Sequence, residues 1–409
     1  MTSQMGGHSP HQYRAILYHM GAASISTIKR WLLGFSLGLW LLPAVQTVLY
    51  MKILRPTRAA FEVKLPRPEF GWRQWYSGEL QPIWESYATQ KLGLREWLVK
   101  PYNQLLYTVW QQSTNTQVLR GKHGMLFERG PVQSALGRIS PATEAQVAAQ
   151  VQGLRAVQDT LARRGKLLVF VIAPSKPELY PENLPDSCQH LPRRPTAYQR
   201  YRRPMQAAGI NVLDLAAVFQ GWKSSSPYPL FSSGGTHWSG YGAVRAADTL
   251  MRYLEARGHF RLPRVRQTGL VVGAAPRYSD DDLMRLLNLL HNPAPAPALA
   301  YPEVTFDPPT PGQCQPRLLL VGDSFGYSFT EFYPYLQHLS APGSAYWYYN
   351  HDVAWTNGPA TGPSLVQDRD LRADLANTDV VLLLFNSANL AGFDFGFSER
   401  AAPVLATNK

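Results

Sequence analysis

Two short segments contain the residue types that acyl-transfer chemistry needs. Residues 317–329, RLLLVGDSFGYSF, place Ser324 at the end of an apolar run. A serine becomes a useful nucleophile only when a nearby base accepts its proton. Of the ten histidines, His237 is the best candidate base, because it lies in the glycine-rich segment FSSGGTHWSGYGA at 231–243. We expect Ser324 to act as nucleophile and His237 as base; a helix-capping serine and a structural histidine are the alternatives.

The turn after Ser324 also offers hydrogen-bond donors for an oxyanion. Backbone amides at a helix N-terminus stabilise negative charge, so Phe325 and Gly326 are candidates. Asn386 ends another apolar run, and its side-chain amide is a further candidate, with a turn-forming asparagine as the alternative. Asp323 precedes the nucleophile, and we expect it to fix the turn rather than to carry a proton.

The elements that must position these residues are predicted from apolar runs. Five such runs, separated by helical stretches, occur at 166–174, 210–215, 317–323, 345–350 and 379–386. Unbroken apolar runs are what a parallel sheet covered on both faces requires. An amphipathic helix is predicted at 141–165, between the candidate cap Ser140 and Gly165. The fold class is therefore α/β, doubly wound, and ligands bind such sheets at the carboxyl ends of the strands.

The chain has several segments besides the predicted sheet. Residues 31–51 contain no charged side chain, and this segment is long enough for a helix that crosses a bilayer. We expect a cytoplasmic segment at 1–30, a transmembrane anchor at 31–51, a helical connector at 52–118 and a catalytic domain at 119–409. A loop-rich insertion is predicted around 261–316. Basic residues flank the span on both sides, so charge alone does not orient it.

The composition is that of a folded, basic protein. The net charge of +12 over 409 residues attracts polyanions. The densest basic run is PRRPTAYQRYRRP at 192–204. A solvated helix and loop is one interpretation of this run, and a surface that meets an acidic polysaccharide is another. Nucleic acid is not an expected partner of a membrane-anchored chain.

Metal and disulfide signals are weak. Cys188 and Cys314 are the only cysteines, and either a disulfide or two free thiols fits the sequence. His8, His11 and His19 match no metal-ligand spacing. No glycine-rich phosphate loop of the usual kinds is present. We therefore expect no metal and no bound cofactor.

Taken together, the motifs resemble the SGNH hydrolase-like domain of the alginate O-acetyltransferase family, of the AlgJ and AlgX type. The resemblance rests on THWSGYGA and GDSFG, on GKHGMLF at 121–127, on APSKPELYPENLP at 173–185 and on the helix SDDDLMRLL. GKHGMLF is similar to the family's GKDGWLF, and APSKPELYPENLP is similar to its Pro-x-Lys and Tyr-Pro-Glu-x-Leu-Pro segment. The histidine motif precedes the serine motif, as in the family, and the resemblance covers roughly residues 80 to 390.

The resemblance implies a flavodoxin-like sheet and an enzyme that acetylates hydroxyls of an exported polysaccharide. It would sit on the inner membrane, with its globular domain periplasmic or otherwise exoplasmic. Ser324 would carry the acetyl group, which a membrane-bound O-acyltransferase partner would relay. Lys176 and Tyr180 fall in a family-like motif and would line the cleft, with packing as the alternative for Tyr180.

The chain departs from the family at Gly235. The family's motif is Asp-x-His-Trp, in which the aspartate orients the histidine. Three hypotheses follow: another acceptor holds the ring, the domain only binds or scaffolds polysaccharide, or it is an acetyl esterase. The acceptors considered are a backbone carbonyl, Ser233, Asp280, Asp281 and Asp352. We expect Gly235→Asp to raise activity if the turn tolerates a side chain, and to strain it if the glycine needs positive φ.

Overall fold

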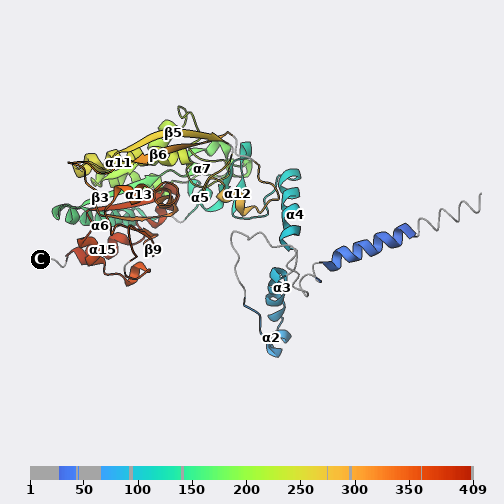
Figure 1. The fold of residues 1–409 in the computed structure, drawn as a ribbon. Coiled ribbons are helices and arrows are strands. Elements are labelled where there is room, and N and C mark those ends of the chain that lie inside the picture. Colours follow the sequence, from blue (N-terminus) through green and yellow to red (C-terminus); the bar gives the residue numbers. More distant parts are fainter. Residues whose placement is uncertain are drawn as a thin grey trace, which may run out of the picture. The chain divides into compact units, whose positions relative to one another are not determined.

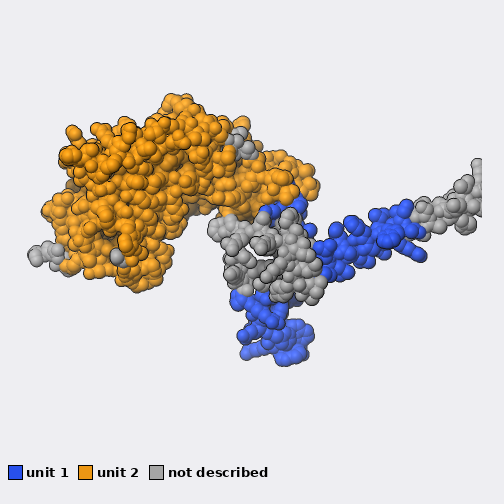
Figure 2. Space-filling model, viewed as in Figure 1, with its two compact units in different colours: residues 1–104 blue, residues 105–409 orange. Residues whose placement is uncertain are grey.

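A computed structural model describes most of the chain. The described residues are 27–42, 45, 66–91, 95–139, 142–273, 275–293, 297–360 and 362–406. They fall into two compact units, residues 1–104 and 105–409 (Figure 2). The second unit contains the sheet and all of the candidate site.

The first unit is helical where it is described. Residues 27–42 form a helix, followed by α2 (Trp72–Tyr76) and α3 (Leu80–Lys91). The predicted transmembrane span at 31–51 is not supported, because no helix among the described residues combines the length and the apolarity needed to cross a bilayer. Positions 43, 44 and 46–51 of that span lie outside the described residues.

The second unit (Figure 1) is built around a six-stranded sheet. The order of its strands is β4-β3-β10-β7-β8-β9. Its strands are β3 (Leu167–Ala173), β4 (Val212–Asp214), β7 (Leu318–Gly322), β8 (Ala345–Tyr348), β9 (Asp352–Thr356) and β10 (Val380–Asn386). The five apolar runs became the five parallel strands, as predicted. The sheet is nevertheless mixed, because β9 runs antiparallel to β8. Only residues 349–351 join these two strands, and so short a hairpin permits antiparallel pairing alone.

Helices cover both faces of the sheet, as predicted. Alternate side chains of β10 enter two hydrophobic layers: Val380, Leu382 and Leu384 one, and Val381, Leu383 and Phe385 the other. The first layer is closed by α10 (Leu215–Trp222) and α11 (Gly240–Gly258). The second is closed by α6 (Glu144–Arg163), α9 (Ala197–Ala207), α14 (Leu371–Ala376) and α15 (Phe397–Ala406). Burial on both sides explains why these strands are apolar throughout.

Helix α6 shows how local sequence sets an element's ends. It begins at Thr143, whose side chain accepts from the Gln146 backbone while the Gln146 side chain accepts from the Thr143 backbone. This reciprocal pair is a capping box, and it places the start two residues inside the predicted range. Gly165 closes the helix with a φ of 70°. The candidate cap Ser140 lies outside the described residues.

The segment 261–316 is more regular than predicted. Strands β5 (Val265–Gly273) and β6 (Leu299–Phe306) pair antiparallel, and β6 lies against α11. Between them is the short helix α12 (Asp282–Leu286), within the stretch where a helix was predicted. Flanking prolines and the mostly exposed side chains of β5 conceal these strands in the sequence.

Shorter elements complete the unit. They are α4 (Arg95–Val109), which starts in the first unit, β1 (Val118–Arg120), β2 (Leu126–Glu128), α5 (Arg129–Ala135), α7 (Lys176–Leu179), α8 (Asp186–Gln189), α13 (Tyr335–Leu339), and the 3-10 helices η1 (Lys122–Gly124), η2 (Pro181–Asn183), η3 (Ser324–Phe329), η4 (Val366–Asp368) and η5 (Ser387–Gly392).

Candidate active site

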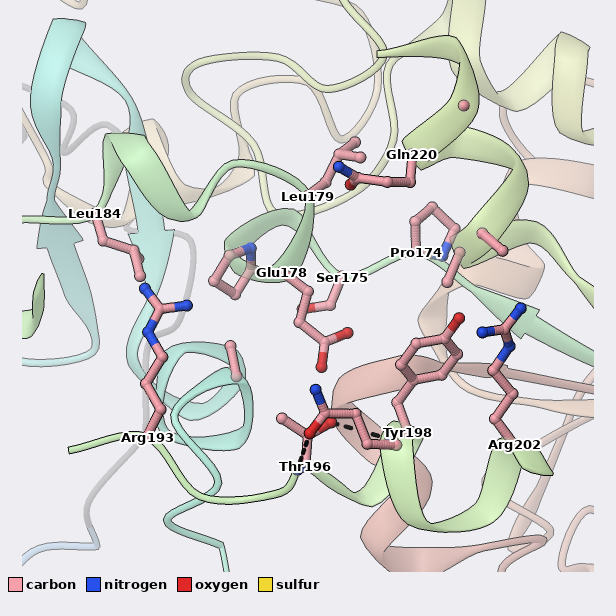
Figure 3. A pocket seen from close by; sticks show the side chains of 16 residues that line it. Pro174, Ser175, Glu178, Leu179, Leu184, Arg193, Thr196, Tyr198, Arg202 and Gln220 are labelled. Carbon is pink, nitrogen blue, oxygen red and sulfur yellow. Dashed lines mark hydrogen bonds between the residues drawn. The ribbon is translucent and has the colours of Figure 1, made fainter. Parts of the chain in front are cut away.

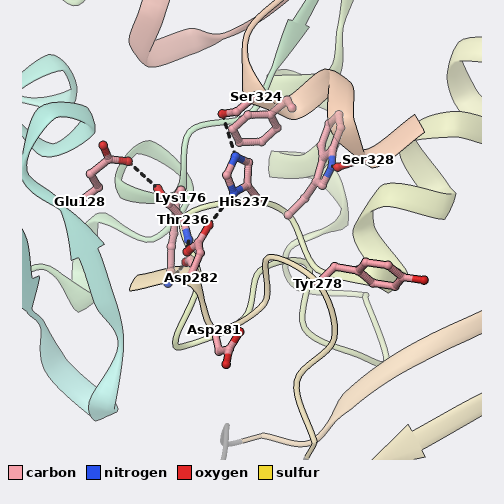
Figure 4. Close-up of polar contacts among 12 residues, drawn as sticks. Glu128, Lys176, Thr236, His237, Tyr278, Asp281, Asp282, Ser324 and Ser328 are labelled. Atoms are coloured by element: carbon pink, nitrogen blue, oxygen red, sulfur yellow. Dashed lines mark hydrogen bonds and ion pairs between the residues drawn. The ribbon is translucent and has the colours of Figure 1, made fainter. Parts of the chain in front are cut away.

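Ser324 and His237 meet at the carboxyl edge of the sheet. Ser324 is the first residue of η3, directly after β7 and Asp323. His237 lies three residues before α11, whose N-cap Ser239 accepts from the backbone of Gly242. The His237 Nε2 atom is 2.8 Å from the Ser324 Oγ atom (Figure 4). The histidine motif and the serine motif, which were predicted to act together, are therefore in hydrogen-bond contact.

A carboxylate holds the other side of the histidine ring. The His237 Nδ1 atom is 2.7 Å from Oδ2 of Asp282, the first residue of α12. The other oxygen, Oδ1, accepts from the Thr236 backbone at 2.8 Å. Because an ionised carboxylate only accepts hydrogen bonds, Nδ1 donates to Asp282 and Nε2 is left to accept the Ser324 proton. Ser324, His237 and Asp282 thus form a complete triad.

The carboxylates nominated from the sequence are engaged elsewhere, so those nominations were wrong. Asp280 is buried and accepts from the Tyr301 hydroxyl at 2.7 Å. Asp281 pairs with Arg285 at 3.4 Å, and Asp352 with His351 at 2.9 Å. Figure 4 shows Asp281 directed away from the triad.

Gly235 is explained by a close approach of backbone. A Cβ atom at this position would lie 2.5 Å from the Ser279 carbonyl oxygen and 3.0 Å from the carbonyl group of Asp280. Gly235 is not among the positive-φ glycines, so conformational freedom is not the reason. The missing side chain lets the segment that carries Asp282 pass directly against the histidine loop. The glycine that stands in place of the family's aspartate therefore makes room for Asp282, which bonds the histidine ring instead.

The surroundings of His237 favour its charged form. Burial alone would lower the pKa of the ring, but the hydrogen bond and charge of Asp282 raise it, and the charges of Asp323 and Glu128 add to this. The net result is a pKa above the ordinary value. A base in this setting accepts a proton readily and holds it while charge develops on the substrate.

Asp323 holds the turn that presents the nucleophile. Its carboxylate accepts from the backbone of Phe325 at 3.1 Å, from the backbone of Asn386 at 2.6 Å and from the Asn389 side chain at 2.7 Å. These bonds join the ends of β7 and β10. Asn389 was missed in the sequence, where only its place shortly after an apolar run could have indicated it.

The nominated oxyanion donors are already used. The Phe325 amide donates to the Asp323 carboxylate, and the Gly326 amide donates to the Asp323 carbonyl at 2.9 Å. The Asn386 side-chain amide donates to the Pro174 carbonyl at 3.0 Å and its oxygen accepts from Ala388. Asn386 is therefore a turn-forming residue in this structure, and each of the three nitrogen atoms already donates to an acceptor within the protein.

Lys176 lies behind the histidine loop and not in the cleft. Its side chain is buried, and Nζ donates to the carbonyls of Leu126 at 2.7 Å, Ser233 at 3.1 Å and Gly235 at 2.7 Å. Burial lowers the pKa of Lys176 to about 7, against the charges of Asp282 and Asp280. The lysine ties β2 to the loop that carries His237.

Tyr180 is a packing residue. Its ring meets Phe231 edge-on, with centroids 6.3 Å apart, and the Lys223 ammonium lies 5.1 Å from the ring centroid. Burial raises the pKa of Tyr180 to about 12. The packing alternative for this residue is the one that the structure supports.

The histidines, acidic residues and cysteines that could have formed a metal site or a disulfide remain to be placed. Within the described residues, no group of three or more histidine, cysteine or acidic side chains is arranged to hold a metal ion. His8, His11 and His19 lie outside the described residues. Cys188 is buried and Cys314 exposed, and both are free, so the disulfide alternative was wrong.

This chain is similar in sequence to known proteins. The family model described as "SGNH hydrolase-like domain, acetyltransferase AlgX" matches residues 118–349. A probable alginate O-acetylase AlgJ from Azotobacter vinelandii is 31% identical over 174 residues, 42% of this chain and 41% of that protein. A protein with the same description from Pseudomonas aeruginosa is 29% identical over 175 residues, 42% of each chain. The matches thus span about two fifths of the length of these relatives.

Two solved structures are similar at lower identity. The O-acetyltransferase domain of Pseudomonas putida AlgJ has a TM-score of 0.45 at 19% identity, over 71% of this chain and 99% of that chain. Pseudomonas aeruginosa AlgX has a TM-score of 0.40 at 16% identity, over 71% of this chain and 67% of that chain.

Proposed function

Because the chain belongs to the family of the SGNH hydrolase-like domain of the acetyltransferase AlgX, we propose that it is an O-acetyltransferase that uses an acetyl-serine. The observation that carries this proposal is the unbroken line of hydrogen bonds from Ser324 through His237 to Asp282. A serine in such a line is activated for attack on an acyl group.

The first half of the reaction loads the enzyme. His237 accepts the Ser324 proton at Nε2 while the Ser324 oxygen attacks the carbonyl carbon of the acetyl donor. Asp282 stabilises the imidazolium that forms. The donor's leaving group then takes the proton from His237 and departs, and the acetyl group stays on Ser324 as an ester.

The second half transfers the acetyl group. A hydroxyl of the polysaccharide gives its proton to His237 and attacks the acetyl carbon. The bond to Ser324 breaks, and the serine oxygen recovers the proton from His237. The relatives are described as probable alginate O-acetylases, and we take an acidic, exported polysaccharide as the acceptor. Water in the place of the sugar would make the protein an acetyl esterase.

The test is a burst assay with p-nitrophenyl acetate on the intact chain. We expect a burst of p-nitrophenol and a chain whose mass has grown by one acetyl group, both absent from Ser324→Ala and His237→Ala. The exposed Ser225→Ala serves as the matched control and should keep the burst. A folded chain that gives no burst would favour the hypothesis of a binding or scaffolding subunit.

The same assay separates transferase from esterase. When a mannuronate oligosaccharide is added to the acetylated chain, we expect the acetyl group to be transferred to the sugar. Free acetate released at the same rate with and without the sugar would identify an esterase.

We also propose that the domain works on the exoplasmic side of the inner membrane, beside a membrane-bound O-acyltransferase that relays the acetyl group. Apolar side chains of the helix at 27–42 support a membrane-held N-terminus, since Trp31 and Trp40 are 76% and 84% exposed. Alkaline phosphatase fused after Lys409 should be active in cells, because that enzyme needs an oxidising compartment. An inactive fusion that is nonetheless full-length would contradict this location.

A further inference from the structure

A cavity lies at the carboxyl edge of the sheet, apart from the triad. It measures about 490 Å³, a size typical of small-molecule sites. Its walls come from the end of β3, from α7, from α9 and from the start of α10 (Figure 3). No triad residue lines it. The basic run at 192–204, which the triad leaves unexplained, supplies five of its polar side chains: Arg193, Thr196, Tyr198, Gln199 and Arg202.

One of the side chains that line this cavity carries a hydroxyl group that is not hydrogen-bonded. Ser175 is 1% exposed, and its Oγ atom has no hydrogen-bond partner within the described part of the chain. Ser175 stands at the N-cap of α7, yet its side chain makes no cap bond. A buried hydroxyl without a partner is destabilising, and a ligand hydroxyl in the cavity would satisfy it.

Glu178 provides a second polar group beside Ser175. It projects from the same short helix, and the Ser387 hydroxyl donates to its carboxylate. Burial raises the pKa of Glu178, and its carboxyl oxygens can accept hydrogen bonds from ligand hydroxyls. The two side chains together suit a ligand with several hydroxyl groups.

The two arginines at the cavity differ in their charge balance. Arg202 forms an ion pair with Asp214 at 2.6 Å, so its charge is compensated. Arg193 is exposed at the rim, and no ion pair is found for it among the described residues. An uncompensated guanidinium prefers a carboxylate or phosphate.

Apolar side chains complete the lining. They are Ala135, Pro174, Pro177, Leu179, Leu184, Ala216 and Ala217. A ligand that fits must therefore combine an anionic group, hydroxyls and a carbon face. A uronic acid residue of a polysaccharide has all three.

We propose that this cavity binds an acidic sugar residue of the polymer, with its carboxylate at Arg193 and its hydroxyls at Ser175 and Glu178. The identity of the polymer rests on the proposed function, whereas the cavity's preference for a uronate rests on its own lining. The ends of β3 and β7 are two strand spacings apart, about 10 Å, so one polymer chain reaches both the cavity and Ser324.

Helix α7 forms the wall between the two sites. Lys176 on this helix bonds the histidine loop, while Ser175 before it and Glu178 within it line the cavity. The cavity is thus a subsite that holds the polymer while a neighbouring hydroxyl is acetylated.

The test is a calorimetric titration of the intact chain carrying Ser324→Ala with a mannuronate trisaccharide and, separately, with the neutral mannotriose. We expect the uronate to bind at least ten-fold more tightly than the neutral sugar. Adding Arg193→Gln should remove that preference, whereas the neighbouring Arg194→Gln, which does not line the cavity, should keep it.

Equal binding of the two sugars, or an unchanged uronate affinity in Arg193→Gln, would overturn the inference. Both arginines are exposed, so neither variant should fail to fold. The burst assay on the unmodified chain is independent of this result. Uronate binding that depends on Arg193 in a chain without a burst would refute the proposed catalysis and leave the subsite standing.

Discussion

The orienting carboxylate of the triad comes from a residue that lies outside both the histidine motif and the serine motif. Asp282 is 45 positions from His237 and bonds both the ring and the Thr236 backbone. We predict that Asp282→Asn lowers the rate of the p-nitrophenol burst by about 10⁴, because an amide stabilises the wrong tautomer of the ring. Stopped-flow measurement of the burst checks this.

The neighbouring Asp281→Asn is the matched control for that variant. Asp281, the N-cap of α12, forms an ion pair with Arg285 at 3.4 Å and does not bond the histidine ring. The burst rate of this variant should stay within a few-fold of the unmodified chain. Equal losses in the two variants would mean that the segment, and not the carboxylate of Asp282, matters.

The pH dependence of the burst reports the state of His237. The ring must be neutral to accept the Ser324 proton, and its pKa lies above the ordinary 6.5. We predict that the rate falls as the pH drops through a midpoint above 6.5. Because Asp282 is a cause of the raised pKa, its replacement by asparagine should move the midpoint to lower pH. A pH profile of the residual burst in both proteins checks this, and an unshifted midpoint would contradict the assignment.

The glycine at position 235 sets a steric limit on the loop. A Cβ there would lie 2.5 Å from the Ser279 carbonyl oxygen, whereas at Gly234 the nearest atoms are 3.4 Å away. We predict that Gly235→Ala costs about 1–3 kcal/mol of unfolding free energy, as overpacking does, and also reduces the burst. Gly234→Ala should be nearly neutral. Urea unfolding followed by fluorescence checks both variants.

This limit reverses the expectation that the sequence alone suggests for Gly235→Asp. That substitution adds the family's carboxylate, but it also pushes away the segment that carries Asp282. Activity should therefore fall. An increase in the burst rate would show that the loop accommodates the side chain.

At the scale of elements, Lys176 joins β2, α7 and the histidine loop through three carbonyls. We predict that Lys176→Met lowers the burst rate constant and leaves the burst KM for p-nitrophenyl acetate nearly unchanged, since the lysine positions the base without touching substrate. The Ser233 carbonyl would keep the Leu126 amide as a donor, whereas the carbonyls of Leu126 and Gly235 would lose the lysine, at about 1–3 kcal/mol each. Burst kinetics at several substrate concentrations separate the two parameters.

Lys166 offers a matched control at the opposite end of β3. Its Nζ atom also bonds two carbonyls, those of Ala376 at 2.8 Å and Thr378 at 2.7 Å. Lys166→Met should lose stability but keep the burst of the remaining folded protein. If both variants lost the burst to the same extent, Lys176 would have a structural role and no positioning role.

The elements differ in how well their sequences predict them. Strands buried on both faces, such as β10, have an unbroken apolar pattern and were predicted nearly to the residue. β9 and β5 are partly or mostly exposed, and β6 contains Pro302, so their patterns are weak. The nucleophile and the base were predicted from local motifs. The acid was not, because three successive aspartates look alike until packing selects Asp282.

At the scale of the whole molecule, the two thiols differ in access. Cys188 is 7% exposed and contacts the small cluster around Phe127 and Val132, whereas Cys314 is exposed. We predict that a maleimide labels one thiol of the native protein, at Cys314, and both thiols after unfolding in urea. Intact-mass measurement checks this. A native protein that labels at neither site until it is reduced would reveal a disulfide.

The triad is shared between the sheet and the segment laid across it. Ser324 follows a central strand, but Asp282 lies in α12, in the stretch that connects β5 to β6. This stretch docks through the Met284 amide on the Gly234 carbonyl at 3.0 Å and through Leu283, Met284 and Leu287. The protein can therefore keep its folded sheet and lose its orienting acid if that segment alone lifts away. We therefore expect the burst to be lost when this segment detaches, even while the sheet stays folded.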